Sequence, residues 1–578
     1  MNHDSDLQIR PGRIRDSRSS RVRPFIAQVL AATRKAGGHV SRHGAITKAP
    51  ASRFGRGKVA SVIAARGLAP RSRAVIVKAR IVRHGRGGGN LANHLKYLER
   101  DGVTRDGEKG ILFGAEGREI GRDSFATQAQ DDRHHFRFIV SPEDALDMAD
   151  LEGFSRDLMH QMQADLGTEL DWVAVEHWNT AQPHVHIIVR GVASDGHDLV
   201  IARDYISEGL RAQARNLVTQ ELGLQTDLDI ARGLERQIGA QRWTDIDRRL
   251  AHDQAREGLI DMAPRAGIRP DAIEFHKLGR LRTLETLGVA REIGRGQWMI
   301  SDDAETQLRE MGLRGDIIKR MNHALVGRGT QRAASSYVLD PPDTQQKIIG
   351  RLIDRGLHGE LEGSAYVIID GIDGRTHHIV LPDLEASGDG RLGAIVELRH
   401  FQDRKGRDRT ALAVRSDMDI GAQVKAPGAT WLDRRNVMQG GRDLGAGFGR
   451  EVEAAMDARA DHLVSQGLAH KQGQRTVFAR NLINTLEAND LDAAAQRLSR
   501  AAGLPRHMPA TGDYVAGTLQ QRVTLASGRF AVIDNGLGFA LVPWTPSLDT
   551  RLGKHISGVM REGGSVEWSF GRARGLGR

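Results

Sequence analysis

The sequence contains no cysteine and no long apolar run, and each absence excludes a class of function. Without cysteine the chain cannot form a disulfide, a zinc–thiolate site or a cysteine nucleophile. The apolar runs fall short of the roughly 20 residues that a membrane-spanning helix needs. No apolar segment follows the charged start of the chain, so we expect no signal peptide and a cytoplasmic location. The sequence also lacks the glycine–lysine loop of nucleotide-binding motors, which argues against an ATPase.

Length and charge indicate several domains and a polyanionic partner. A chain of 578 residues is too long for one hydrophobic core, so about three to four domains are expected. The net charge is +10, and residues 1–80 hold 18 Lys and Arg against three acids, which leaves −5 for the remainder. This pattern favours a basic, largely flexible arm at residues 1–70 that contacts nucleic acid. A solvated tail that only aids solubility is the alternative.

Three histidines, His177, His184 and His186, stand close together in the middle of the chain. The apolar pattern predicts one strand that ends at His177 and a second that begins at His184, joined by a short hairpin. Side chains two residues apart on a strand share a face, so His184, His186 and Ile188 point one way while Val185 packs on the other side. Pairing of the strands would bring His177 close to His184.

The chemistry of this cluster favours a metal site. Imidazole is the commonest neutral metal ligand in proteins, and three imidazoles leave coordination positions open for a substrate. A hairpin with polar residues on a wet face is the alternative, and it would be the better explanation for a single histidine. The spacing H-x6-H-x-H between apolar strands makes the metal site the stronger hypothesis.

A helix upstream carries a candidate nucleophile. The glycine-rich basic loop at residues 85–90 precedes a predicted helix at residues 91–100, in which three leucines form one stripe. Tyr97 lies off this stripe, between Lys96 and Arg100, where a hydroxyl could meet a phosphate. A surface tyrosine without a function is the alternative.

The elements up to residue 225 predict an α+β domain. Alternation and β-branched residues predict strands at 74–82 and 135–140, and Ser141 reads as the N-cap of a helix. Apolar periodicity, ended each time by glycine, predicts helices at 151–166 and 205–222. The order of these elements, over residues 71–225, fits an antiparallel sheet with helices on one face.

The rest of the chain predicts a second, mixed region. Residues 226–330 are helical and include a helix at 275–287 followed by a glycine-turned hairpin at 294–300, which is a winged-helix pattern. Winged helices bind DNA in some proteins and only mediate packing in others. Residues 331–430 read as β-rich, and residues 431–578 mix helical and β segments, so a mixed α/β C-terminal region is expected. No convincing internal repeat is evident.

The motifs together resemble a known enzyme family. His177-x-Asn179-x-x-x-Pro183-His184-x-His186 resembles the third motif of conjugative relaxases, the mobilisation nucleases of plasmids and integrative elements. The form is that of the P-type mobilisation family within the two-His endonucleases. The segment 95–102, which contains Tyr97, resembles the first motif of that family, and Ile139-Val140-Ser141-Pro142 stands where the second motif falls.

This resemblance covers about residues 71–225. From about residue 230 the chain resembles the uncharacterised C-terminal region that is often fused to such relaxases, including Trp431-Leu432-Asp433-Arg434 and the terminal Arg-Gly-Leu-Gly. The fused region implies no activity by analogy.

The resemblance implies the roles of the site residues. Tyr97 would attack DNA, and His177, His184 and His186 would hold one divalent ion, Mg²⁺ or Mn²⁺. Ser141 would help to hold the DNA on the 3′ side.

The implied partners are single-stranded and duplex DNA at a transfer origin, accessory relaxosome proteins and a type IV coupling protein, with no membrane. Basic residues expected to contact the DNA are Arg86, Lys96, Arg100 and Arg190.

One position departs from the family pattern. Many relaxases have Asp where this chain has Asn179, and that Asp is thought to orient or charge the first histidine of the motif. Asn accepts a hydrogen bond from imidazole but stabilises its cation less well. We therefore expect Asn179 to orient His177 as a metal ligand, and the base that deprotonates Tyr97 stays open.

Two other classes of function share these features. A replication initiator or transposase could use the same metal and tyrosine chemistry, and a second catalytic tyrosine would favour it. Tyr205 is the nearest other tyrosine, and its apolar helix indicates packing. A catalytically inactive DNA-binding relative is the other alternative, and it would form no covalent adduct with DNA.

Overall fold

The structure is a computed structural model in which the chain divides into two compact units, residues 1–233 and 234–578. The parts of the chain that it describes are 39–40, 46–47, 55–84, 89–100, 102–117, 119–179, 182–263, 272–339, 347–359, 361, 363–402, 406–438, 444–473, 475–562 and 564–569. Arg86 and most of the expected N-terminal arm lie outside these residues. No helix in the described ranges has the length and apolarity needed to cross a membrane.

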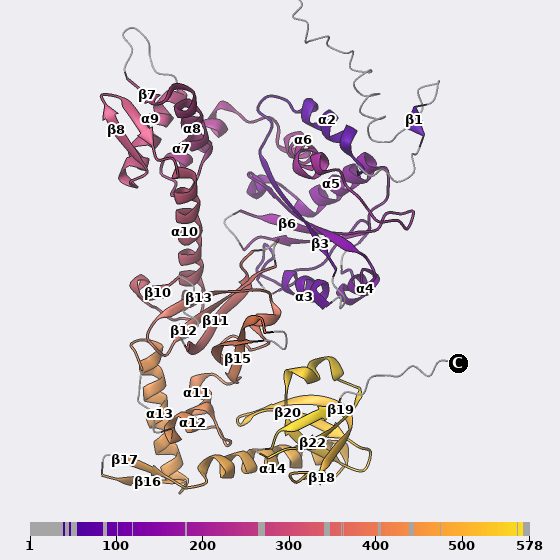
Figure 1. The fold of residues 1–578 in the computed structure, drawn as a ribbon, viewed down its shortest axis with the longest axis vertical. Helices are drawn as coiled ribbons and strands as arrows, with labels where there is room; N and C mark the ends of the chain where they lie inside the picture. The colour runs from indigo at the N-terminus through magenta and orange to yellow at the C-terminus, as the bar shows by residue number, and fades with distance from the viewer. Residues whose placement is uncertain are drawn as a thin grey trace, which may run out of the picture. The chain divides into compact units, whose positions relative to one another are not determined.

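The first unit is built on a four-stranded antiparallel sheet in the order β3-β4-β6-β5 (Figure 1). The strands are β3 (Val75–Arg83), β4 (His134–Pro142), β5 (Trp172–His177) and β6 (His184–Arg190). A two-stranded ribbon, β1 (His39–Val40) and β2 (Ile46–Thr47), precedes them. The antiparallel sheet and the α+β class predicted from the sequence are confirmed.

Helices cover one face of this sheet and bury its largest core. They are α2 (Lys58–Gly67), α5 (Leu151–Leu166) and α6 (Leu210–Leu222), the last preceded by a π-helical turn, η2 (Tyr205–Gly209). Alternate strand residues such as Phe138, Ala174 and Ile187 pack against them. Gly167 and Gly223 follow α5 and α6, as the sequence predicts, and Gly167 has the left-handed conformation (φ 62°) that ends a helix.

A second pair of helices covers the opposite face, so helices lie on both faces instead of one. These are α3 (Gly89–Leu98) and α4 (Arg122–Gln128) (Figure 1). The leucine stripe of α3 packs with Phe125 of α4 against Val173, Val175 and Ile188 of the sheet. The leucine stripe of α3 is predicted correctly from the sequence. Only the pairing of the strands shows which face of the sheet this stripe packs against.

Two further details of this unit differ from the sequence prediction. Ser141 is no N-cap, because β4 continues to Pro142 and a 3-10 turn, η1 (Ala145–Asp147), follows. The cap of α5 is Asp150, whose carboxylate accepts from the amide of Glu152. The described fold also includes residues 55–67, inside the stretch expected as an arm, since the amide of Arg56 bonds the carbonyl of Val200 at 2.7 Å.

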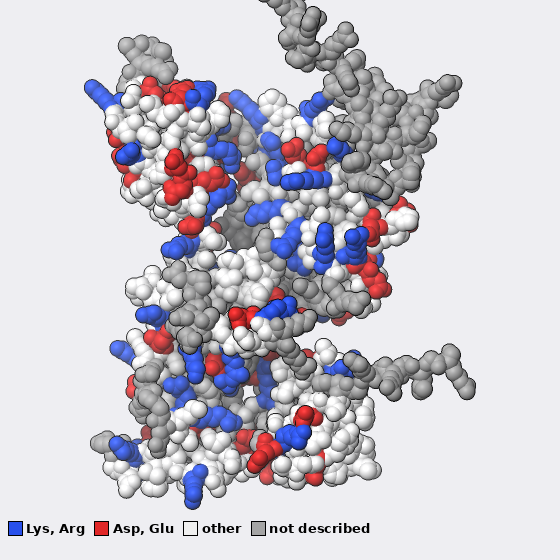
Figure 2. All heavy atoms as spheres, in the orientation of Figure 1, with Lys and Arg blue, Asp and Glu red and all other residues white. Residues whose placement is uncertain are grey.

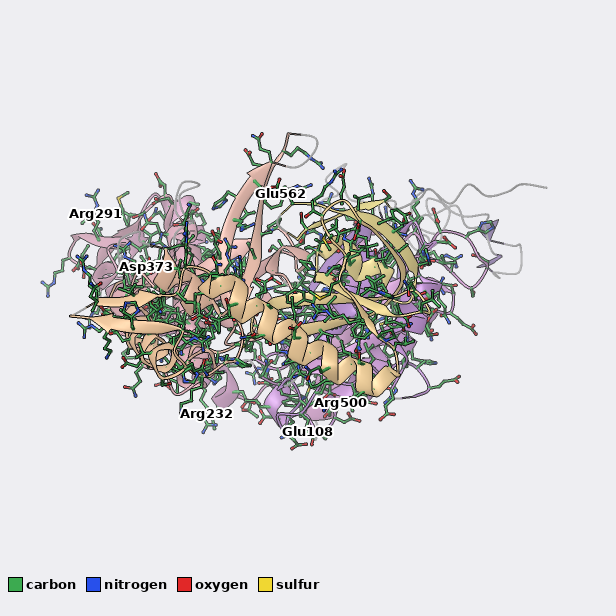
Figure 3. All side chains as sticks on the ribbon, turned by 90° about the horizontal axis from the view of Figure 1, so that it is seen from below. Glu108, Arg232, Arg291, Asp373, Arg500 and Glu562 are labelled. Carbon is green, nitrogen blue, oxygen red and sulfur yellow. The ribbon has the colours of Figure 1, made fainter. Side chains whose placement is uncertain are left out.

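The second unit starts with the predicted winged-helix arrangement. Its elements are α7 (Asp227–Ile238, which begins in the first unit), α8 (Asp245–Glu257), β7 (Ile260–Asp261), α9 (Ala272–Thr286), β8 (Ala290–Gly294), β9 (Gln297–Ile300) and α10 (Ala304–Val326). The three strands pair in the order β7-β9-β8. Arg291 on β8 is exposed and points away from the ribbon (Figure 3).

A six-stranded sheet in the order β10-β13-β12-β11-β14-β15 follows these helices. Its elements are η3 (Ala334–Ser336), β10 (Tyr337–Val338), β11 (Ile349–Leu357), β12 (Ala365–Gly371), β13 (Thr376–Leu381), η4 (Glu385–Ser387), β14 (Ile395–Gln402) and β15 (Asp408–Ser416). In this part of the chain the helices precede the strands of the sheet.

The same succession of helices and strands then occurs again. The helical part holds α11 (Ile420–Gln423), α12 (Trp431–Val437), α13 (Phe448–Ser465), β16 (Ala469–Gln472), β17 (Arg475–Phe478) and α14 (Leu482–Ala502). The sheet has the order β18-β21-β20-β19-β22-β23. Its elements are β18 (Arg506–His507), β19 (Tyr514–Leu525), β20 (Gly528–Asp534), β21 (Phe539–Pro543), η5 (Pro546–Arg551), β22 (His555–Met560) and β23 (Val566–Ser569).

The two sheets have the same topology, so the second unit consists of two copies of one module, and the expectation that the chain has no internal repeat is wrong. In each sheet the first strand has two residues and pairs parallel to the fourth. Each third strand pairs with the second across a bulge, at Leu352/Asp354 in one copy and Leu519/Gln521 in the other. The expected boundary at residue 430 falls inside the second copy, between α11 and α12.

A buried arginine clamp confirms the equivalence of the copies. Arg280 is fully buried and binds the carboxylate of Asp247 through Nε and Nη2 at 2.8 and 2.9 Å. Arg459 binds Asp433 in the same way and at the same distances. Each guanidinium also donates to three backbone carbonyls in the segment before the helix that carries the aspartate: those of Ile238, Ala240 and Arg242, or of Val424, Ala426 and Gly428.

Candidate active site

The three histidines of the motif converge on the face of the sheet that α3 covers. β5 and β6 pair with His177 directly opposite His184, as the spacing predicts. All three side chains are buried, and one ring nitrogen from each lies within 4.8 Å of the others. The ring centroids of His177 and His186 are 4.5 Å apart. Such a set could hold one metal ion.

Backbone carbonyls orient two of these rings. Nε2 of His177 lies 3.0 Å from the carbonyl oxygen of Leu98, and Nδ1 of His184 lies 3.0 Å from that of Gln182. A carbonyl only accepts, so each of these nitrogens carries the proton and the other nitrogen of the ring has the lone pair. Nε2 of His184 therefore has the lone pair that could bind a metal. It lies 3.2 Å from Nε2 of His186. This is the tautomer pattern that metal-binding histidines use.

Burial keeps His186 in its neutral form. It lowers the pKa of His186 well below the usual value, and the nearby His177 and His184 lower it further. Protonated imidazole cannot bind a metal, so an environment that disfavours protonation favours coordination. The chemistry of the donor set, three buried imidazoles, fits a divalent transition-type ion.

The helix of the candidate nucleophile ends at this cluster. Tyr97 is half-buried in the last turn of α3, one residue before the Leu98 whose carbonyl binds His177. The guanidinium of Arg100 lies over the Tyr97 ring, 4.3 Å from its centroid. The charge of Arg100 also contributes to the lowered pKa of His186. The structure therefore brings Arg100 and the helix end that carries Tyr97 to the histidines.

Two other predicted residues lie on or near this face. Ser141 is buried, and its hydroxyl donates to the carbonyl oxygen of Pro183 at 3.2 Å. The β4–β6 register, in which Val140 is opposite Val185, places Ser141 level with His184. Lys96 on α3 is exposed.

Two predicted residues, Asn179 and Arg190, are not brought to the site. Asn179 is exposed, and no described residue bonds it, so Leu98 and not Asn179 orients His177. Arg190, at the far end of β6, binds the carboxylates of Asp132 and Asp171 at 2.9 Å each, which engages its guanidinium within the fold. Arg86 lies outside the described residues.

Sequence reasoning missed a layer of buried polar residues beside the histidine cluster. His94 of α3 is buried, and its pKa is lowered well below the usual value by burial and then by Arg137, His135 and His177. Burial lowers the pKa of His135 to about 2, with further contributions from Arg137 and His84. The available signal was the alternation of β4, in which His135 and Arg137 interrupt an apolar run at every second position.

Comparison with known proteins finds two families. The MobA/VirD2-like relaxase nuclease domain matches residues 118–224, which include the three histidines but not Tyr97. DUF3363, a family of proteins of unknown function, matches residues 277–414 and 399–577, slightly more than half of the chain. No curated protein and no solved structure matches the chain.

Proposed function

Since this chain belongs to the DUF3363 family and carries a MobA/VirD2-like relaxase nuclease domain, we propose that it nicks one DNA strand at a transfer origin through Tyr97. The observation that carries the proposal is the hydrogen bond from His177 to Leu98. It joins the helix end that bears the only candidate nucleophile of the motif to three histidines that can hold a metal.

The reaction is a transesterification at phosphorus. The Tyr97 phenol loses its proton, its oxygen bonds to the scissile phosphorus, and the bond from phosphorus to the 3′ oxygen breaks. The 3′ oxygen gains a proton, and the 5′ end stays bound to the protein as a phosphotyrosine. One phosphodiester replaces another, so the energy of the bond is kept and the strand can be re-joined by reversal.

The residues of this chain prepare that step in two ways. One divalent ion, Mg²⁺ or Mn²⁺, held by His177, His184 and His186 would offset charge on the phosphate and align the phosphorus. Three nitrogen ligands favour Mn²⁺, because Mg²⁺ prefers oxygen. Arg100 fixes the Tyr97 ring from one face and adds positive charge beside the cluster.

The proposed setting is conjugative transfer. The covalent protein–DNA complex would pass to a recipient cell through a type IV secretion channel, with accessory relaxosome proteins and a coupling protein as partners. A replication initiator with two catalytic tyrosines is disfavoured, because Tyr205 is fully buried and its hydroxyl donates to Asp165 at 2.8 Å.

The test is adduct formation with single-stranded oligonucleotides that tile the DNA beside the gene, in the presence of Mn²⁺. We expect one oligonucleotide to give a denaturant-resistant adduct with the full chain and none with Tyr97→Phe. Tyr514→Phe, an exposed tyrosine in the second unit, is the matched control and should keep the adduct. An adduct that persists in Tyr97→Phe would remove the nucleophile assignment, and the lack of any adduct would favour the inactive relative.

A further inference from the structure

Arg137 is a buried arginine on the face of the sheet that carries the histidine cluster. In β4 it lies directly opposite Arg80 of β3 and Ile188 of β6, and its side chain is only 3% exposed. Opposite residues of an antiparallel pair share a face, so Arg137 points to the same side as His186. It is the diagonal neighbour of His186, which corresponds to about 7–8 Å between the two backbones.

Among the residues that the structure describes, the guanidinium of Arg137 has one hydrogen-bond partner, and that partner is neutral. Its Nε donates to Nε2 of His135 at 3.0 Å. The Nδ1 of His135 in turn donates to Nε2 of His84 at 2.5 Å, so the chain of hydrogen bonds fixes the arginine from one side. Nη2 of Arg137 is buried and has no partner among the described residues. Burial and the neighbouring Arg80 lower its pKa to about 10, which still leaves it charged near neutrality.

Two other buried arginines of this protein have charged and polar partners on all sides. Arg280 and Arg459 each face a bidentate aspartate and three carbonyl oxygens. Arg137 has no carboxylate partner within the described part of the chain and faces a second arginine instead. A buried charge without a partner strongly destabilises a fold, and such groups persist where a ligand supplies the missing charge. The arrangement therefore indicates an anion site.

Exposed basic side chains lie beside the buried Arg137. Lys78 and Arg80 lie on the same face of β3 and are exposed, because α3 and α4 pack over the other strands. Figure 2 shows Lys and Arg side chains gathered on the first unit where Figure 1 draws β3. The planar guanidinium fork suits the oxygens of a phosphate.

We infer that Arg137, flanked by Lys78 and Arg80, binds a backbone phosphate next to the scissile one and so positions the DNA strand over the histidine cluster. This inference rests on the proposed function. Arg137 is a positioning residue, and it would act through the strand that Tyr97 attacks. Lys78 and Arg80 would guide the strand along the exposed edge of β3.

The first test separates a binding role from a structural one. Arg137→Met keeps the length of the side chain and removes the unpaired charge, so the melting temperature should be unchanged or higher. The affinity for the cleavable strand in single-stranded form should fall by about 10-fold or more, the usual effect of losing a charge-assisted hydrogen bond. The salt dependence of binding should flatten by about 0.7 in slope, the contribution of one phosphate contact on a single strand. Arg211 is an exposed arginine on α6 at the other face of the sheet. The control variant Arg211→Met should change neither the affinity for DNA nor its salt dependence.

The second test locates the contact. Single phosphates of the oligonucleotide are replaced in turn by uncharged methylphosphonates, and binding is measured in a Tyr97→Phe background in which no strand is cut. We expect replacement of one phosphate beside the scissile phosphate to weaken binding of the oligonucleotide by the parent chain but not by Arg137→Met. Arg137→Lys, which keeps the charge and loses the fork, should retain part of that sensitivity.

The outcomes distinguish this inference from the proposed function. A lower melting temperature in Arg137→Met with unchanged DNA affinity would make Arg137 structural and overturn the inference while Tyr97-dependent adducts remain. Equal methylphosphonate sensitivity in the parent and Arg137→Met at every position would also overturn it. If the parent binds no strand at all, both the inference and the proposed function fail.

Discussion

Nε2 of His177 donates to the carbonyl oxygen of Leu98 across 79 positions of sequence, at 3.0 Å. Leu98 is the last residue of α3, where a helix leaves carbonyl oxygens without intrahelical partners. The contact therefore satisfies the helix end, selects the tautomer of a metal ligand and fixes the residue that follows Tyr97.

Removing His177 should loosen the end of α3. His177→Ala takes away the partner of the Leu98 carbonyl, so the amides of residues 97–100 should exchange with solvent several-fold faster. His184→Ala removes a metal ligand without touching Leu98 and should leave these amides unchanged. Hydrogen exchange measured by mass spectrometry without added metal would show the difference, and equal exchange in the two variants would contradict the proposed link.

Removing two ligands should abolish tight metal binding. His184→Ala combined with His186→Ala leaves a single imidazole, so calorimetry with Mn²⁺ should show an affinity at least about 100-fold weaker, because losing only an outer partner of a ligand already costs about 10- to 100-fold. The exposed His197→Ala is the control. Chelation by EDTA should stop nicking by the parent chain. Undiminished Mn²⁺ binding in the double variant would refute the ligand assignment.

The two arginine clamps should contribute equally to their modules. Arg280→Ala leaves the buried Asp247 carboxylate without its cation, and Arg459→Ala does the same to Asp433. Each should destabilise its module by about 3–5 kcal/mol, the usual effect of breaking a buried pair. Arg282→Ala and Arg450→Ala, exposed on the same two helices, should cost under about 0.5 kcal/mol. Urea unfolding checks this, and a large effect in one copy alone would argue against equivalence.

The second unit should lose stability in mild acid. His378 is 2% exposed, stacks on Tyr366, and has a pKa of about 4, lowered by burial and then by His358 and Arg320. The unfolded chain binds the proton at its ordinary pKa near 6.5, so protons favour unfolding between pH 6.5 and 4. Stability from this group is complete above pH 6.5 and falls by about 3 kcal/mol as the pH drops to 4.

His378→Phe should flatten that part of the stability profile, because phenylalanine keeps the stack on Tyr366 and does not titrate. His470→Phe, at an exposed position on β16, should leave the acid loss as it is in the parent. Thermal unfolding at several pH values measures both. An acid loss of the same size in His378→Phe would assign it to other groups.

Much of the nuclease fold could be read from local pattern. The alternation around His184 and His186 fixed which side chains share a face, and the glycines after α5 and α6 marked the ends of both helices. These features depend on neighbours in sequence, since strand and helix periodicity are local properties. For the same reason the three histidines were identified as a cluster, because two come from one strand and the third from the strand it pairs with.

Long-range pairing decided the rest. Ser141 has the local pattern of a helix cap, yet the pairing of β4 with β3 and β6 carries the strand through Pro142. Whether Arg137 and His135 face the histidines depends on the order of the strands, which no local pattern reports. The two copies of the C-terminal module share a strand order and a buried Arg–Asp clamp, and it is the pairing of the strands that shows their equivalence. The sequence by itself determined the residues of the metal cluster, and tertiary structure decided which groups orient it and which arginine is left without a partner.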